Sequence, residues 1–212
     1  MSRPTETPNP LDTSSHDILL SCKGRWSFII VFAIFQTIVG FQIGYIFCYT
    51  NQITPALNAK FNWTGSAATI NESIVGSSAT LTLMIGAGCA GKLVQRGRRN
   101  ALLISAYLGI IGTAITVWEN YACIIAGRLL YGFSVGIIAI AMPRVMEETV
   151  PLNLVGFYAG LYCLSFAAAT LFAYMFAIFL PPDDDTSALK TTHVTNIIFG
   201  LPILFYLLQL LI

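Results

Sequence analysis

Six long apolar segments, separated by short polar stretches, leave this chain few folds to adopt. They cover about 26–49, 74–94, 101–118, 121–142, 154–180 and 194–212. A helix needs roughly 20 mostly apolar residues to cross a hydrocarbon core of about 30 Å. With 56% apolar residues, 10% charged residues and a mean hydropathy of +0.73, the sequence predicts an all-α, six-span transmembrane bundle over residues 26–212. Residues 1–25 are predicted to form a polar cytoplasmic tail.

Lys and Arg concentrate on one side of the predicted spans. Eight lie in the tail or in the loops on its side, two lie on the opposite side, and Arg128 lies within the fourth span. Because cytoplasmic loops carry an excess of Lys and Arg, we expect both chain ends to be cytoplasmic. The expected location is the plasma membrane, with an organellar membrane as the alternative. The eight are Arg3, Lys23, Arg25, Lys92, Arg96, Arg98, Arg99 and Arg144, and the two are Lys60 and Lys190.

The first outer loop that this topology predicts, residues 51–73, contains two acceptor sequons for N-glycosylation. They are Asn62-Trp63-Thr64 and Asn71-Glu72-Ser73. A sequon can be used only on the outer side, where this loop is expected. Asn62 and Asn71 are therefore candidate glycosylation sites.

No pattern in the sequence predicts catalysis or a bound metal. Neither His16 nor His193 has a Ser, Asp or Cys at a catalytic spacing beside it. The five cysteines are scattered singly, without the spacing of a metal site or a disulfide framework. We therefore expect no enzyme activity, no catalytic residue, no metal and no cofactor, and no surface suited to nucleic acid. No acidic side chain lies in the middle of a span, which argues against proton coupling.

Three blocks of residues have spacings specific enough to compare with known families. The first is Gln42-x-Gly44-Tyr45 followed by Asn51, and the second is the basic segment from Gly91 to Arg99. The third and longest is Gly127-Arg128-x3-Gly132-x3-Gly136-x6-Pro143, followed by Glu148 and Pro151. Together they resemble the sugar porter family of the major facilitator superfamily. The chain is similar to the first six-helix half of a facilitative hexose transporter over nearly everything after Arg25.

This resemblance implies half of a major facilitator fold in a lipid bilayer. Such proteins move a sugar-like solute by alternating access between two six-helix halves, and an ion-pair network latches the cytoplasmic helix ends in the outward-open state. The gating residues implied here are Gly91, Lys92, Gln95, Arg96, Arg98, Arg99, Arg144, Glu147 and Glu148. The implied solute-pathway residues are Gln42, Tyr45, Asn51, Arg128, Tyr162 and Cys163.

The residue types of the fourth span indicate a role for it on physical grounds, independently of the resemblance. Arg128 is costly in lipid, so its side chain should face an interior cavity or a partner. Gly127, Gly132 and Gly136 leave flat patches on which neighbouring helices can approach closely. The fourth span is therefore expected to be a packed helix that carries a functional cation.

Four positions and the length of the chain depart from the family pattern. The basic segment is one residue short, because Gly97 directly follows Arg96, and its acidic or amide position is Gln95. Val155 stands where the family usually has an arginine. Cys163 stands where a glutamine of the hexose transporters hydrogen-bonds the sugar. The chain also has one six-helix half where the family has two.

The sequence leaves two functions open. The first is a transporter, or half of one, that moves a sugar or related polyol by facilitated diffusion. Its second half would come from self-association, another chain or further sequence. The second is a degenerate transporter half that serves as a structural subunit of a larger membrane protein complex. Gln95, Val155, Cys163 and the missing second half favour it.

Overall fold

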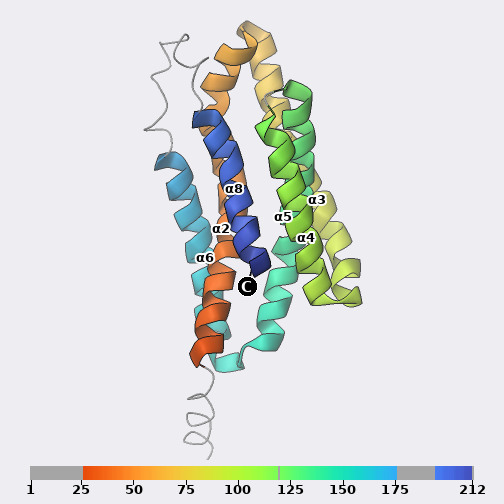
Figure 1. Cartoon of the computed structure of the whole chain (residues 1–212), viewed down its shortest axis with the longest axis vertical. Helices are drawn as coiled ribbons and strands as arrows, with labels where there is room; N and C mark the ends of the chain where they lie inside the picture. The colour runs from red at the N-terminus through yellow and green to blue at the C-terminus, as the bar shows by residue number, and fades with distance from the viewer. Residues whose placement is uncertain (1–25, 119, 176–193, 212) are drawn as a thin grey trace, which may run out of the picture. The chain divides into compact units, whose positions relative to one another are not determined.

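The computed structural model describes residues 26–118, 120–175 and 194–211. The chain divides into two units, Met1–Ile34 and Phe35–Ile212. The first contributes the beginning of one helix, and the second contains the helix bundle. In the described ranges the regular structure is entirely helical (Figure 1). The helices are α2 (Trp26–Phe61), α3 (Gly65–Arg96), α4 (Arg98–Val117), α5 (Tyr121–Thr149), α6 (Leu152–Met175) and α8 (Val194–Leu211).

Five of these helices, α2 to α6, are long and apolar enough to cross a membrane. The remaining one, α8, has a shorter apolar stretch, Thr195–Leu211. The expected all-α, multi-pass bundle is therefore confirmed for the described part of the chain.

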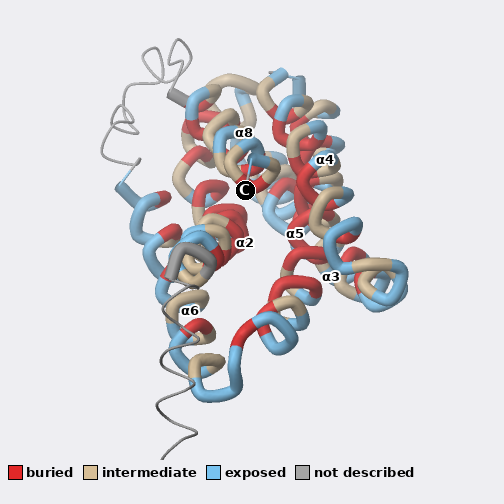
Figure 2. The backbone as a smooth tube through the Cα atoms, turned by 60° about the horizontal axis from the view of Figure 1, so that its bottom comes forward, coloured by how far each residue is buried: buried red, intermediate tan, exposed pale blue. Residues whose placement is uncertain are grey.

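Small residues let neighbouring helices pack closely on α5. The helix packs against α3 and against α4, and α4 packs against α8 as well. A Cβ atom on Gly132 or Gly136 would clash with the backbone of α3, and one on Gly127 would clash with α4. The flat patches expected on this span are thus occupied by helices of the same half. Buried residues accordingly cluster in the middle of α5, and the end of the helix is exposed (Figure 2).

The α2 and α6 helices approach each other in the same way. Gly40 faces the hydroxyl of Ser165, and Gly44 faces the carbonyl oxygen of Phe166, with no room for a Cβ atom at either glycine. A side chain on either glycine would force the two helices apart, because the opposing atoms belong largely to the backbone or to a short side chain.

The α2 helix continues beyond the predicted first span, and the expected loop shrinks to the turn Asn62–Thr64. The extension is amphipathic, because Ile53, Ala56 and Leu57 are buried at helical spacing. Asn62 follows the helix with a positive φ of 54°, a conformation that Asn tolerates better than most residues. Hydropathy missed this extension because a helix need not end where the hydrocarbon core ends.

Two other boundaries differ from the prediction. The α3 helix begins at Gly65 rather than near Ile74, and the α5 helix continues past Met142 to Thr149. Residues 176–180 of the predicted fifth span, the tail over residues 1–25 and His193 lie outside the described residues.

Candidate functional site

The α5 helix carries Arg128 into the space between α2 and α3, where only 1% of the residue is exposed. Its Nη1 donates hydrogen bonds to the Thr50 hydroxyl at 2.5 Å and to the Tyr49 hydroxyl at 3.2 Å, both on α2. The guanidinium carbon lies 5.2 Å from the centre of the Tyr49 ring, close enough for cation–π attraction. Uncharged groups of α2 therefore hold this buried cation.

A cavity of about 240 Å³ lies beside Arg128. The α2 helix contributes Thr50 and Asn51 to its wall, and α3 contributes Gly76 and Thr80. The structure thus brings Asn51 and Arg128, two of the predicted solute-pathway residues, to one cavity. Sequence reasoning missed Thr50, which follows Tyr49 on a helix that was expected to end there.

Gln42 lies inside the bundle rather than at this cavity. It is fully buried, and its Nε2 donates to Gln209 Oε1 of α8 at 3.1 Å. Gln209 in turn donates to the carbonyl oxygen of Leu102 on α4 at 3.2 Å, while Tyr131 donates to the Gln42 backbone carbonyl at 3.2 Å. Gln42 Oε1 is buried without a hydrogen-bond partner among the described residues. This chain of amides connects α2, α8 and α4.

The other predicted pathway residues also lie apart from the cavity. Tyr45 is buried, donates to the Ile198 carbonyl oxygen at 2.9 Å and stacks on Tyr49 with ring centres 5.2 Å apart. Tyr162 is half-buried on α6, and its neighbour Cys163 is exposed. The structure therefore separates the predicted set into two interior residues, two cavity residues and two residues of α6.

A cluster of interior hydroxyl groups between α5, α4 and α8 was not predicted from the sequence. Ser134 of α5 donates to the Ser105 carbonyl oxygen of α4 at 2.7 Å, and its hydroxyl lies 2.9 Å from that of Tyr206 on α8. The signal that points to it, and to Gln209, is a polar residue within an apolar span. Such residues usually face other helices, because an unsatisfied polar group in hydrocarbon is costly.

At the other end of the bundle, Gly97 alone separates α3 from α4. It has a φ of 140°, which L-residues rarely adopt, and its N–H donates to the Val94 carbonyl oxygen at 3.1 Å. Glycine reaches this conformation at little steric cost. The basic segment, one residue short by the family pattern, is thereby accommodated.

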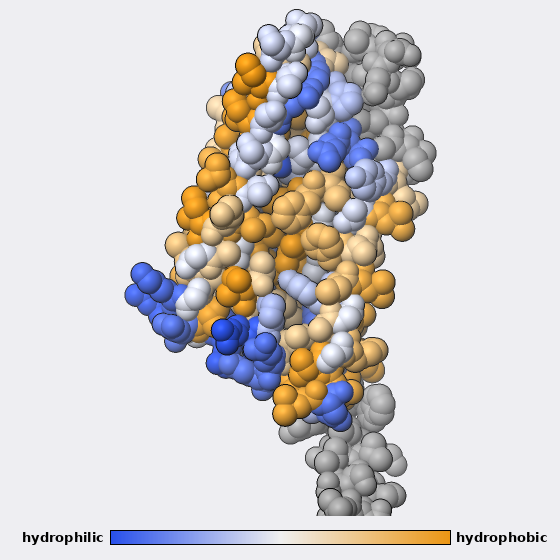
Figure 3. Space-filling view, turned by 180° about the vertical axis from the view of Figure 1, so that it is seen from behind, coloured by the Kyte–Doolittle hydropathy of each residue, from blue (hydrophilic) through white to orange (hydrophobic). Residues whose placement is uncertain are grey.

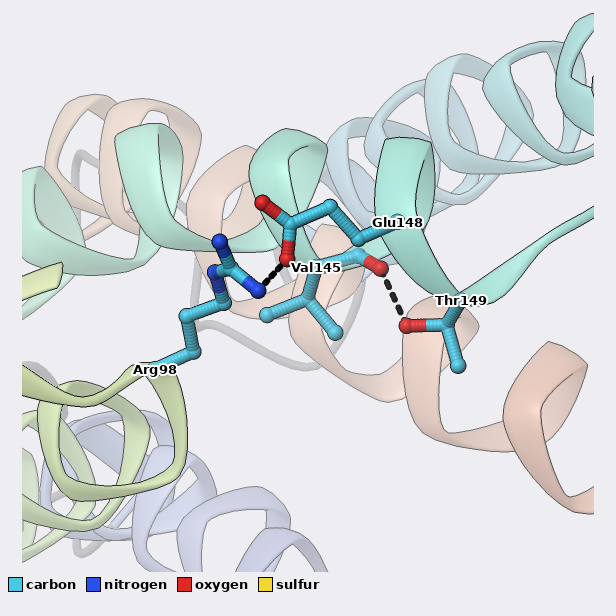
Figure 4. Close-up of polar contacts among 4 residues, drawn as sticks. All are labelled: Arg98, Val145, Glu148 and Thr149. Atoms are coloured by element: carbon cyan, nitrogen blue, oxygen red, sulfur yellow. Dashed lines mark hydrogen bonds and ion pairs between the residues drawn. The ribbon is translucent and has the colours of Figure 1, made fainter. Parts of the chain in front are cut away.

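Arg98, the first residue of α4, forms an ion pair with Glu148 near the end of α5 (Figure 4). Beside it, the Thr149 hydroxyl donates to the Val145 carbonyl oxygen. The side chains of Arg98 and Glu148 are 50% and 38% exposed, so water screens their attraction.

The remaining members of the predicted gating set gather around this pair without joining it. Within the described ranges, none of them forms an ion pair that bridges two helices. Strongly hydrophilic surface collects where α3 turns into α4, next to an apolar band on the bundle (Figure 3). The exposed members are Gly91, Lys92, Gln95, Arg96, Arg99, Arg144 and Glu147.

Comparison with known proteins identifies the family. Residues 29–212 match the family described as sugar (and other) transporters. The chain belongs to this family. Its relatives are membrane transporters rather than enzymes, and the predicted sugar porter resemblance is confirmed. In the described part of the chain, no group of three His, Cys, Asp or Glu side chains is placed to hold a metal ion.

Relatives match this chain over part of their own length. The sugar transporter ERD6-like 6 of Arabidopsis thaliana is 30% identical over 142 residues, which cover 66% of this chain and 28% of that protein. Hexose transporter 1 of Plasmodium falciparum is 25% identical over 181 residues, which cover 80% and 36%. The inward-open xylose transporter XylE of E. coli has the same fold, with a TM-score of 0.74 at 21% identity over 86% of this chain and 46% of that one. This chain therefore spans less than half the length of each.

Proposed function

We propose that this chain forms half of a transporter that moves a sugar or related polyol by alternating access. The match of residues 29–212 to the sugar transporter family carries the proposal. Facilitated diffusion is the mechanism we infer, because in the described spans no carboxylate lies near Arg128 to relay a proton. The distribution of Lys and Arg supports cytoplasmic chain ends, and the plasma membrane is the inferred location.

Glycines on α3 and α6 that have open space beside them support the presence of a second six-helix half. A Cβ atom on Gly76 or Gly88 of α3, or on Gly156 or Gly160 of α6, would meet nothing within 4 Å. Small residues in membrane helices mark places where another helix approaches closely, as Gly136 does inside this half. We infer that these faces of α3 and α6 pack against the second half, supplied by self-association, another chain or further sequence.

The Arg98–Glu148 pair supports a cytoplasmic gate between the two halves. It joins the start of α4 to the end of α5 at the basic segment. An exposed pair contributes at most about 1 kcal/mol, which biases a two-state equilibrium by roughly fivefold. This pair alone is therefore a weak latch, to which contacts of the second half would add.

Stereospecific uptake tests the proposed transport. The chain is purified in a mild detergent with whatever it binds, reconstituted into liposomes and supplied with labelled D- or L-hexose. We expect saturable uptake of the D-enantiomer when both halves are present. The matched variants are Thr80→Val at the cavity, which should lower uptake, and Ile111→Val on the exposed face of α4, which should not. Absence of stereospecific uptake at every protein density would reject the proposal.

The alternative is a transporter half that persists as a structural subunit of a larger membrane complex. Gln95, Val155 and Cys163 depart from residues that the family uses for gating and sugar binding, and large apolar side chains of α6 such as Phe157 are exposed. Co-migration with unrelated membrane proteins in mild detergent would favour this alternative, and a lone chain or homodimer would exclude it.

A further inference from the structure

Arg128 carries a buried charge that no carboxylate neutralises within the described part of the chain. The ion pair found there joins Arg98 and Glu148 instead. The contacts of Arg128 are the hydroxyls of Thr50 and Tyr49 and the ring of Tyr49, which carry no charge. A buried charge is normally paired, because moving it out of water is costly.

The guanidinium also keeps unused hydrogen-bonding capacity. Both hydrogen bonds leave from Nη1, whereas Nε is buried with no partner in the described ranges. Arginine presents its donors as a planar fork that suits carboxylates and other anions. A buried donor without an acceptor destabilises the folded state. An acceptor bound beside Arg128 would therefore stabilise the folded protein.

The cavity beside Arg128 has room for such an acceptor. Its volume of about 240 Å³ is several times the roughly 30 Å³ that one water molecule occupies in the liquid. Asn51 and Thr80 add neutral hydrogen-bonding side chains to the cavity wall, and Gly76 adds no side chain. We propose that Arg128 forms the cationic floor of a binding site for a small, singly charged anion in this cavity.

The anion has two possible sources with the same chemistry, namely a free inorganic anion such as chloride and a carboxylate carried by an organic solute. Asn51 also belongs to the proposed solute pathway, so the organic source would be a sugar-like solute that carries a carboxylate, and this source rests on the proposed function. Binding itself does not depend on transport. It is measured on the purified chain, so its failure and the failure of sugar uptake are separate results.

The test is a titration of the purified full chain in detergent with sodium chloride and, separately, with sodium acetate. The large HEPES anion keeps the ionic strength constant. We expect saturable stabilisation in thermal unfolding by at least one of the two anions, because a ligand bound only to the folded state stabilises it. Chloride alone would indicate an inorganic anion, and acetate would indicate a carboxylate.

Two variants locate the site. Arg128→Gln should weaken the apparent affinity about tenfold or more, as expected when charge-assisted hydrogen bonds are lost. Gly76→Leu places a side chain at the cavity wall where nothing lies within 4 Å, so it should abolish binding in a chain that still folds. Ala114→Leu, on the exposed side of α4 and outside the cavity wall, should bind like the unaltered chain. No saturable effect of either anion, or equal binding by the Gly76 and Ala114 variants, would overturn the proposal.

Discussion

Gly136→Ala is expected to destabilise the chain, although alanine favours a helix over glycine. A Cβ atom at this position would clash with the carbonyl oxygen of Leu83 and would lie 2.9 Å from the Ala87 nitrogen and 3.1 Å from the Gly86 Cα. All of these atoms belong to the backbone of α3, so no side-chain rotation can relieve the overlap. The α3 and α5 helices must move apart along a contact that otherwise packs closely.

The size of the effect follows from two opposing contributions. Overpacking a well-packed interior costs about 1–3 kcal/mol, and a clash with backbone belongs in the upper part of that range. The higher helix propensity of alanine offsets at most about 1 kcal/mol. The free energy of unfolding should therefore fall by about 1–2 kcal/mol, which lowers the unfolding midpoint by roughly 2–8 °C for a chain of this size.

Gly200→Ala on α8 is the matched control, because its Cβ atom would meet only the Val117 side chain at 3.8 Å, an ordinary van der Waals contact. This variant should keep or slightly raise the unfolding midpoint. Thermal unfolding of both variants in one detergent, followed by tryptophan fluorescence, provides the comparison. Equal midpoints for the two variants, or a Gly136→Ala midpoint at or above that of the unaltered chain, would refute the packing argument.

Three further predictions concern the two ends of the bundle. Asn62→Gln should abolish N-glycosylation in a gel-mobility assay, and Asn71→Gln should not. The reason is that Asn62 is exposed in a turn, whereas Asn71 lies within α3 and accepts a hydrogen bond. Loss of the glycan-dependent mobility shift in Asn71→Gln alone would contradict this. Gly97→Ala should lower the free energy of unfolding by about 1–3 kcal/mol through its positive φ, and an unchanged denaturation midpoint would oppose it. A double-mutant cycle on Arg98 and Glu148, each replaced by Ala, should give a coupling below about 1 kcal/mol; a larger value would show that the pair is less screened than its exposure indicates.

The spans and the family were predictable because both depend on patterns along the chain. Apolar segments separated by short polar stretches located the helices, and the block from Gly127 to Pro151 identified the family without a gap. The outer extension of α2 was not predictable from hydropathy, since Ile53, Ala56 and Leu57 recur too sparsely to register in an apolar window. Their helical spacing was nevertheless present in the sequence.

The composition of the site was only partly predictable. Arg128 was singled out because a charge in a span is costly, and it does line a cavity together with Asn51. The sequence did not reveal which groups would face it, because Tyr49 and Thr50 come from a helix far away along the chain. For the same reason, Gln209 was not recognised as the partner of Gln42. Pairings between helices depend on rotation about each helix axis, which single-helix patterns do not specify.

The two connections at the basic end of the bundle have a mechanical consequence. Gly97 is the whole connection between α3 and α4, and Val150 and Pro151 are the whole connection between α5 and α6. Neither has spare length to absorb a displacement of one helix against the next. At this end, α3 and α4 must therefore move as one pair and α5 and α6 as another, so that a displacement shifts two helices at a time rather than one.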